Sequence, residues 1–357
     1  MNNEKFRILV IGNKERFIHL NDFLHELNKK NISTKLIYDL DYVTKFFDLN
    51  VIQKQKKKRS IEKILETFNP DIVLLDRISK IVRIIIPKNI PIWILLRGNY
   101  WEETKWAKNT IYTSKKDRLS LQKNEELVDY CFNNCELILP ISKYLEEQVR
   151  KIYPNKNIKM FPADGRNPND WNIVESKKLK HPCVGLLQGL NVWGKTKELL
   201  LLDKVMKELP EVTFYLAGTG IYENRIIPKL NKNKNFIWLK HINYSNEVKE
   251  FLSEIDVYLL LSGLEGLGQT IIESLLMKRP TIASNVGGIP ELIKDNETGF
   301  LVQNGSEEEI VSKISKILAN SDLSERISTN GHAFVKKEFS WQNIAEKFES
   351  ILKAQKG

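Results

Sequence analysis

The stretch from Ser262 to Glu291, with the sequence SGLEGLGQTIIESLLMKRPTIASNVGGIPE, limits the folds open to this chain more than any other segment. The residues just before it, 257–261, form an apolar run of the length that a buried strand has. Gly266 and Gly268 then precede a segment whose apolar residues recur at helical spacing, at positions 271, 272, 275 and 276. The stretch therefore predicts a strand, a tight glycine loop and a helix, which is the repeating unit of α/β folds with a parallel sheet.

Glu265 and Glu273 give this predicted unit a chemical character. The start of a helix leaves backbone N–H groups unpaired and favours negative charge, and glycines let a phosphate approach the backbone closely. Carboxylates do not bind phosphates, but they accept hydrogen bonds from hydroxyls. A phosphate cradle flanked by two carboxylates suits a sugar nucleotide, with Glu265 on the sugar and Glu273 on the ribose. Exposed glutamates near a helix start are also ordinary, so the pair needs support from the rest of the sequence.

A second glycine turn follows the predicted helix. The segment GGIPE, at 287–291, comes after a β-rich run at 281–283, and residues 298–302 predict a further strand. Together these segments resemble the donor-binding core of glycosyltransferase family 4. The family's E-x7-E motif corresponds to Glu265 and Glu273, and its GGxPE motif corresponds to Gly287, Gly288, Pro290 and Glu291. The resemblance implies retaining sugar transfer and the α/β fold called GT-B, in which two Rossmann-like, doubly wound domains face a central cleft. It is strong over the C-terminal half and only topological over the N-terminal half.

Lys195 is the expected ligand of the diphosphate. The family has the pattern G-R-L-x3-K-G in this region, and Gly189 and Lys195 match it at the right spacing. Leu190 replaces the family's arginine and Thr196 replaces its second glycine, so one positive charge is unaccounted for. Either Lys197 or Arg97 could supply that charge, and the sequence does not decide between them. A lysine at a helix start is also an ordinary solvated residue, which is the competing interpretation.

The resemblance extends to the other loops of the C-terminal half. A strand at 212–217 is expected to end in a G-x-G turn that lines the nucleotide site, and the loop after a strand at 235–239 meets the base in relatives. Glu265 and Lys195 are the expected catalytic residues. The residues expected to bind the sugar donor are Gly189, Lys195, Gly218, Gly220, His241, Glu265, Gly266, Leu267, Gly268, Gln269, Thr270 and Glu273.

The N-terminal half is expected to bind the acceptor. A strand at 7–11 leads into Gly12 and Asn13, and a strand at 90–96 leads into Arg97 and Asn99. Loops at the carboxyl ends of strands in open α/β sheets face the ligand crevice, so these four residues are the acceptor-side candidates. The family often has a histidine in this region and this chain has none nearby. The expected domains are residues 1–175, with a helix at 341–357 packing back on them, and residues 180–340, separated by a polar linker at 162–182.

Length and charge set the remaining limits. The 357 residues suggest two domains, and no window is apolar enough to predict a membrane span. Without a signal-peptide pattern, the chain is expected to be cytoplasmic. Residues 1–170 hold 31 Lys and Arg against 22 Asp and Glu, and so carry most of the net charge of +10. Two interpretations of this excess stay open: peripheral contact with an anionic membrane or acceptor, and general solubility.

The leading hypothesis is a glycosyltransferase that moves a sugar from a nucleotide-diphosphate sugar to a saccharide or lipid-linked saccharide acceptor. A UDP-sugar is the favoured donor, and GDP-mannose is the alternative. No cofactor or metal is expected, because no cluster of His, Asp and Glu in the sequence suggests a metal site, because the family usually works without one, and because Cys131 and Cys135 favour core positions over a metal pair. A sugar-nucleotide epimerase or phosphorylase on the same fold is the alternative. A nucleic-acid-binding protein ranks lower and nucleic acid is not an expected partner, because the basic charge is diffuse and no binding module is recognisable.

Overall fold

The computed structural model describes residues 6–12, 20–42, 51–176 and 178–356. Two compact units emerge. The first contains the residues up to Tyr100, Ser114–Gly165 and the residues from Trp341 on; the second contains Trp101–Thr113 and Arg166–Ser340. The chain passes from the first unit to the second at 165–166, inside the polar segment 162–182 that was expected to link the domains, and residues 101–113 also belong to the second unit, which the sequence did not indicate.

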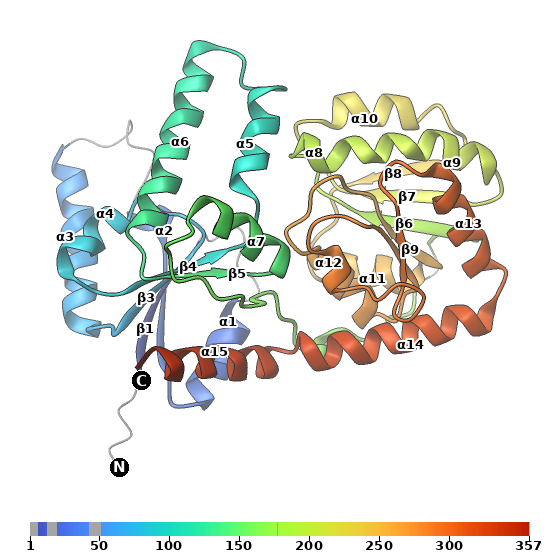
Figure 1. The fold of residues 1–357 in the computed structure, drawn as a ribbon. Coiled ribbons are helices and arrows are strands. Elements are labelled where there is room, and N and C mark those ends of the chain that lie inside the picture. Colours follow the sequence, from blue (N-terminus) through green and yellow to red (C-terminus); the bar gives the residue numbers. More distant parts are fainter. Residues whose placement is uncertain (1–5, 13–19, 43–50, 177, 357) are drawn as a thin grey trace. The chain divides into compact units, whose positions relative to one another are not determined.

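The first unit is built on a five-stranded parallel sheet with the strand order β2-β1-β3-β4-β5 (Figure 1). Its central strands are short and buried, and they are apolar except for Asp76 at the end of β3, as expected for a sheet covered on both faces. The strands are β1 (Arg7–Gly12), β2 (Ser33–Tyr38), β3 (Ile72–Asp76), β4 (Ile92–Leu96) and β5 (Leu137–Pro140). The helices are α1 (Leu20–Lys29), α2 (Asp39–Tyr42), α3 (Val51–Phe68), α4 (Val82–Ile85), α6 (Lys115–Asn133), α7 (Lys143–Ile152) and α15 (Trp341–Lys356).

Helix α15, at the C-terminal end of the chain, packs on α1 within this unit. The ring of Phe23 on α1 lies 5.5 Å from that of Trp341 and 5.4 Å from that of Phe348. Gly165 is required at the end of the unit, because a Cβ there would come within 2.5 Å of the Trp341 ring. Aromatic packing therefore joins the last helix of the chain to elements from its beginning.

The second unit contains a six-stranded parallel sheet with the order β11-β10-β9-β6-β7-β8 (Figure 1). The strands are β6 (Cys183–Leu187), β7 (Thr213–Ala217), β8 (Phe236–Lys240), β9 (Val257–Leu260), β10 (Thr281–Ser284) and β11 (Phe300–Val302). The helices are α8 (Trp193–Thr196), α9 (Leu202–Glu208), α10 (Glu223–Leu230), α11 (Asn246–Glu254), α12 (Gln269–Leu276), α13 (Glu307–Leu318) and α14 (Ser321–Glu338), and α5 (Tyr100–Lys108) contributes all but its first residue.

Most predicted elements have close counterparts, and the differences have local causes. The basic run at 53–59 continues directly into the more apolar part of α3, because lysine and glutamine favour helix as much as the residues that follow. The extended segment at 157–161 pairs with the first sheet only through a single bridge between Ile158 and Ile138. Ser142 caps α7, and its hydroxyl accepts a hydrogen bond of 3.2 Å from the Leu145 N–H.

Two predictions from composition can be compared with the described residues. Among these residues, no helix combines the length and apolar character needed to cross a membrane. Cys131 and Cys135 lie buried in and just after α6, where burial raises the pKa of Cys131 to about 11 and that of Cys135 to about 12. Both thiols are therefore protonated core residues, as the sequence indicated.

Candidate active site

The second sheet has one position where the strand order reverses. The chain runs from β6 outward through β7 to β8, then returns to the other side of β6 and runs outward through β9, β10 and β11. All strands are parallel, so the loops after β6 and β9 leave the same edge and diverge from one another. Such a switch point at the carboxyl ends of strands is where open α/β sheets bind ligands.

Lys195 and Glu265 meet at this switch point. Lys195 lies on α8, in the connection that follows β6, and Glu265 lies in the loop that follows β9. The Lys195 Nζ is 3.1 Å from Glu265 Oε2, and the side chains are only 24% and 13% exposed. The Ser262 hydroxyl donates to the other carboxylate oxygen at 3.3 Å. The two expected catalytic residues, 70 positions apart in the sequence, are therefore brought into direct contact.

The backbone around Glu265 is held by glycines of the neighbouring loop. Gly287 has a φ of +57°, and a Cβ there would lie 1.9 Å from the Glu265 carbonyl oxygen. A Cβ on Gly288 would lie 2.2 Å from the Gly266 carbonyl oxygen, and the Gly288 N–H donates to the Glu265 carbonyl at 3.2 Å. The paired glycines of the GGIPE segment thus let the loop after β10 support the loop that carries Glu265.

Glycines also shape the loops after β6 and β7. A Cβ on Gly189 would meet no atom within 4 Å, so this position borders open space. Gly218 and Gly220 serve close packing, because a Cβ on either would lie 1.9 to 2.4 Å from the backbone of Gln188 or Leu190. These two glycines fix the shape of the loop after β6, a role that is separate from the ligand contact expected of them.

Trp106 of α5 supports α8 in the same way. A Cβ on Gly194, the neighbour of Lys195, would meet the Trp106 ring at 2.8 Å. A Cβ on Gly263 would meet the Gly194 carbonyl oxygen at 2.6 Å, so the connections that carry Lys195 and Glu265 also touch through their backbones. Trp106 therefore has a specific packing partner beside the site.

The loop between the two glutamates enters α12 as predicted. Gly268 forms the N-cap with a φ of +99°, a conformation that side chains rarely adopt. Leu267 is 3% exposed and so can offer a ligand only its backbone, whereas Gln269 is exposed. The Thr270 hydroxyl accepts a 2.6 Å hydrogen bond from the Tyr258 hydroxyl of β9. Burial raises the pKa of Tyr258, so this hydroxyl keeps the proton that it donates. The first turn of α12 is therefore rigidly attached to the sheet.

Glu273 is held inside the unit by residues that sequence reasoning missed. Arg166 donates to Glu273 Oε1 from Nη2 at 2.7 Å and from Nε at 3.1 Å, and the Tyr244 hydroxyl donates to the same oxygen at 3.1 Å. The side chains of Arg166 and Glu273 are 2% and 5% exposed. Burial, and then the Glu273 charge, raise the pKa of Tyr244, so its hydroxyl stays protonated and donates. Arg166 lies in the polar segment expected to be a linker, where nothing in the local pattern marks it.

Neither residue proposed to replace the family's arginine is available without rearrangement. Leu190 itself is fully buried. Lys197 pairs with Glu198 at 3.3 Å and lies 5.0 Å from the centre of the Trp106 ring. Arg97 belongs to the first unit, where its guanidinium pairs with Asp76 and Asp164. Burial alone would lower the pKa of Arg97, but these two carboxylates raise it, so the guanidinium is firmly charged.

The remaining predicted residues lie at strand ends. His241 follows β8 and is exposed. In the first unit, Gly12 ends β1, Asn13 lies outside the described residues, and Asn99 donates from its side-chain amide to the Tyr144 hydroxyl at 3.1 Å. The roles of these residues toward a ligand stay predictions.

Comparison with known proteins finds relatives mainly for the second unit. Residues 191–334 match the family described as Glycosyl transferases group 1. An uncharacterized glycosyltransferase of Methanocaldococcus jannaschii is 27% identical over 222 residues, which cover 60% of this chain and 58% of that protein. The chain spans about half the length of the curated relatives it matches.

Solved structures agree with the fold over nearly the whole chain. Sucrose-phosphate synthase from Thermosynechococcus elongatus superposes with a TM-score of 0.75 at 15% identity, covering 98% of this chain and 99% of that one. Anabaena HepE in complex with UDP and glucose superposes with a TM-score of 0.70 at 14% identity, covering 98% and 100%. The expected fold, two Rossmann-like α/β domains of the GT-B type, is confirmed.

Proposed function

We propose that this chain, whose residues 191–334 match the Glycosyl transferases group 1 family, is a hexosyltransferase. It would move a sugar from a nucleotide-diphosphate sugar to a saccharide or lipid-linked saccharide acceptor. The observation that carries the proposal is the contact between Lys195 and Glu265 at the switch point of the second sheet. A cation beside a carboxylate, at the start of a helix, is what a ligand with a diphosphate and sugar hydroxyls requires.

A UDP-sugar is the favoured donor. The Anabaena HepE structures contain UDP, UDP with glucose, or UDP-glucose, and a pneumococcal transferase that also superposes on this chain contains UDP and N-acetylglucosamine. GDP-mannose stays as the alternative. The proposed stereochemical course is retaining. In this course the leaving phosphate takes the proton of the acceptor hydroxyl, so no side chain of the protein has to act as the base.

The chemistry follows from charge development. Cleavage of the bond between sugar and phosphate places negative charge on the leaving diphosphate, and we assign Lys195 and the amides of 266–270 to stabilise it. Glu265 accepts hydrogen bonds from the sugar hydroxyls and thereby orients the sugar. We assign the ribose hydroxyls to Glu273. A carboxylate has about four acceptor sites on two oxygens, so contact with the ribose is compatible with its bonds to Arg166 and Tyr244.

The test uses Glu265→Gln. This change keeps the size of the side chain but removes its charge, so we expect sugar transfer to fall by several orders of magnitude while UDP still binds. Transfer is measured as release of UDP from UDP-glucose with an acceptor mixture, and binding by calorimetry. Glu297→Gln is the matched control, because Glu297 is a 60% exposed glutamate of the same unit. Turnover of Glu265→Gln at the wild-type rate would defeat the assignment, and isomerised sugar formed without an acceptor would favour the epimerase.

Peripheral contact with an anionic membrane is proposed for α3. This helix presents Lys56, Lys58 and Arg59 to solvent, and Ile52 on the same helix is 77% exposed. Exposed basic residues beside an exposed apolar residue favour binding to an anionic lipid surface. We expect sedimentation with vesicles that contain phosphatidylglycerol, weakened by salt. Equal sedimentation with vesicles of phosphatidylcholine alone would contradict this proposal.

A further inference from the structure

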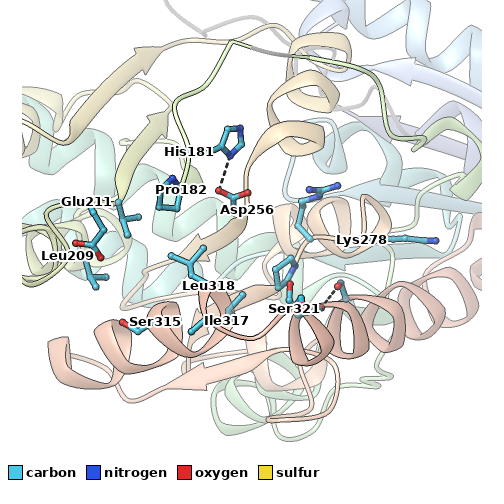
Figure 2. A pocket seen from close by; sticks show the side chains of 16 residues that line it. His181, Pro182, Leu209, Glu211, Asp256, Lys278, Ser315, Ile317, Leu318 and Ser321 are labelled. Atoms are coloured by element: carbon cyan, nitrogen blue, oxygen red, sulfur yellow. Dashed lines mark hydrogen bonds and ion pairs between the residues drawn. The ribbon is translucent and has the colours of Figure 1, made fainter.

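A second group of chemically active side chains lies at the opposite edge of the second sheet. The amino ends of β6, β9 and β10, together with the end of α13 and the start of α14, surround an open pocket of about 890 Å³. Figure 2 shows His181 and Asp256 facing one another beside this pocket. The pocket is separate from the proposed active site, which lies at the carboxyl ends of the same parallel strands.

Three side chains of different chemistry meet there. His181 Nδ1 lies 2.8 Å from Asp256 Oδ2 and 3.6 Å from Cys183 Sγ, and one ligand atom from each of the three residues lies within 4.8 Å of the others. The Cys183 N–H also donates to Asp256 Oδ2 at 2.7 Å, which fixes the carboxylate at the entrance of β6. Imidazole, thiol and carboxylate are the three ligand types that proteins use for zinc.

The dimensions agree with a tetrahedral ion. Bonds of about 2.0 Å to nitrogen and oxygen and about 2.3 Å to sulfur place ligand atoms between about 3 and 4 Å apart. The cluster needs only small side-chain movements to reach such distances. The side chain of His181 is 46% exposed and can move, whereas Cys183 is fully buried and Asp256 is held by the Cys183 N–H, so these two residues give the site its fixed points.

We propose that His181, Cys183 and Asp256 bind one Zn²⁺ ion, with a water molecule from the pocket as the fourth ligand. Binding replaces the thiol proton of Cys183 by the metal and releases that proton to solvent, while His181 binds through Nδ1 and Asp256 through Oδ2. The ion ties the segment that precedes β6 to the start of β9, and its role is to stabilise the second unit. The expectation that this chain holds no metal rested on sequence motifs, and these ligands follow no motif because Asp256 lies 73 residues after Cys183.

The test uses Co²⁺ in place of Zn²⁺, because a cobalt–thiolate bond absorbs in the near ultraviolet. We expect one equivalent of Co²⁺ per full-length chain to produce this absorption and Zn²⁺ to displace it. Cys183→Ser should abolish the absorption, whereas Cys131→Ser, which removes another buried thiol, should leave it unchanged. No cobalt–thiolate absorption in the wild type, or an unchanged band in Cys183→Ser, would overturn the proposal.

His181→Ala provides a second variant that does not disturb a buried position. It should weaken Zn²⁺ binding at least about tenfold while the metal-free melting temperature stays as in the wild type. At a hundredfold excess of Zn²⁺ over its dissociation constant, the wild-type melting temperature should rise by about 5 to 10 °C. A rise of equal size in His181→Ala would contradict the site. None of these measurements uses sugar transfer, so the proposal stands or fails independently of the proposed function.

Discussion

Replacing Gly287 by alanine tests the proposed active site without altering a residue that touches the ligand. Gly287 has a φ of +57°, and an added Cβ would lie 1.9 Å from the carbonyl oxygen of Glu265. Gly305 offers a matched control in the same unit, because its φ is +84° and an added Cβ would meet no atom within 4 Å. Both variants carry the cost of a left-handed alanine, about 1 to 2 kcal/mol, but only Gly287→Ala adds a collision.

The size of the effect follows from that collision. The contact falls about 1.1 Å short of the 3.0 Å below which real Cβ atoms essentially never approach another heavy atom. The obstacle is backbone, so the loop that carries Glu265 must move by a distance on the order of 1 Å. A displacement of this size at a catalytic group costs about a hundredfold in rate. We therefore expect the turnover of Gly287→Ala to fall about a hundredfold below that of Gly305→Ala.

The assay combines release of UDP from UDP-glucose with the melting temperature of each variant. Lower activity with equal melting temperatures would show that the loop after β10 positions Glu265. If the two alanine variants turned over at the same rate, the inference that Gly287 supports the catalytic loop would be refuted. Similar activity but a much lower melting temperature for Gly287→Ala would also refute it, because the glycine would then serve folding alone.

Three further changes have defined outcomes. Arg166→Met should destabilise the second unit by about 3 to 5 kcal/mol in urea unfolding, because it leaves the buried Glu273 carboxylate without its cation. Adding Glu273→Gln should recover part of that loss. Strictly additive effects of the two changes would contradict the pairing. Lys195→Met should lower turnover by about 10² to 10³ with little change in melting temperature, since the pair is partly exposed, and unchanged turnover would remove Lys195 from the mechanism. Burial acts to raise the pKa of Glu254, but hydrogen bonds from the Ser176 hydroxyl and from the backbone of Lys178 and Leu179 outweigh burial and lower this pKa. The ionised Glu254 therefore stabilises the folded protein above pH 4.5, and this contribution is lost as the pH falls through the lower pKa of the folded state. The melting temperatures of wild type and Glu254→Gln should therefore converge on acidification, and a constant difference would contradict the shift.

Local signals predicted most of the fold. The apolar runs that became β6, β7 and β9, and the glycines that follow them, have strong short-range patterns, so the sequence identified the second sheet and the loops at its carboxyl edge. Lys195 and Glu265 were predicted individually, and parallel strands bring them to one edge without further information.

The residues that the sequence missed act over long distances. Arg166 stands in a polar segment with no periodicity, and its partner Glu273 is 107 residues away, so no local pattern connects them. Other residues of the segment expected to link the domains also make distant contacts within the second unit, among them the ring of Trp171 against Tyr244 and the hydrogen bond from the Val174 N–H to Ser253. Buried polar contacts of this kind become visible only when the fold has brought the partners together.

The ion pair between Lys195 and Glu265 has a consequence for which molecules compete at the site. The Lys195 ammonium group has a counter-charge 3.1 Å away in Glu265, so a small inorganic anion gains little by displacing that carboxylate. A sugar nucleotide differs, since its phosphates can engage the lysine while its hydroxyls compensate the released carboxylate. Cellular phosphate should therefore be a weak inhibitor, and only a molecule that satisfies both charges at once should exclude the substrate.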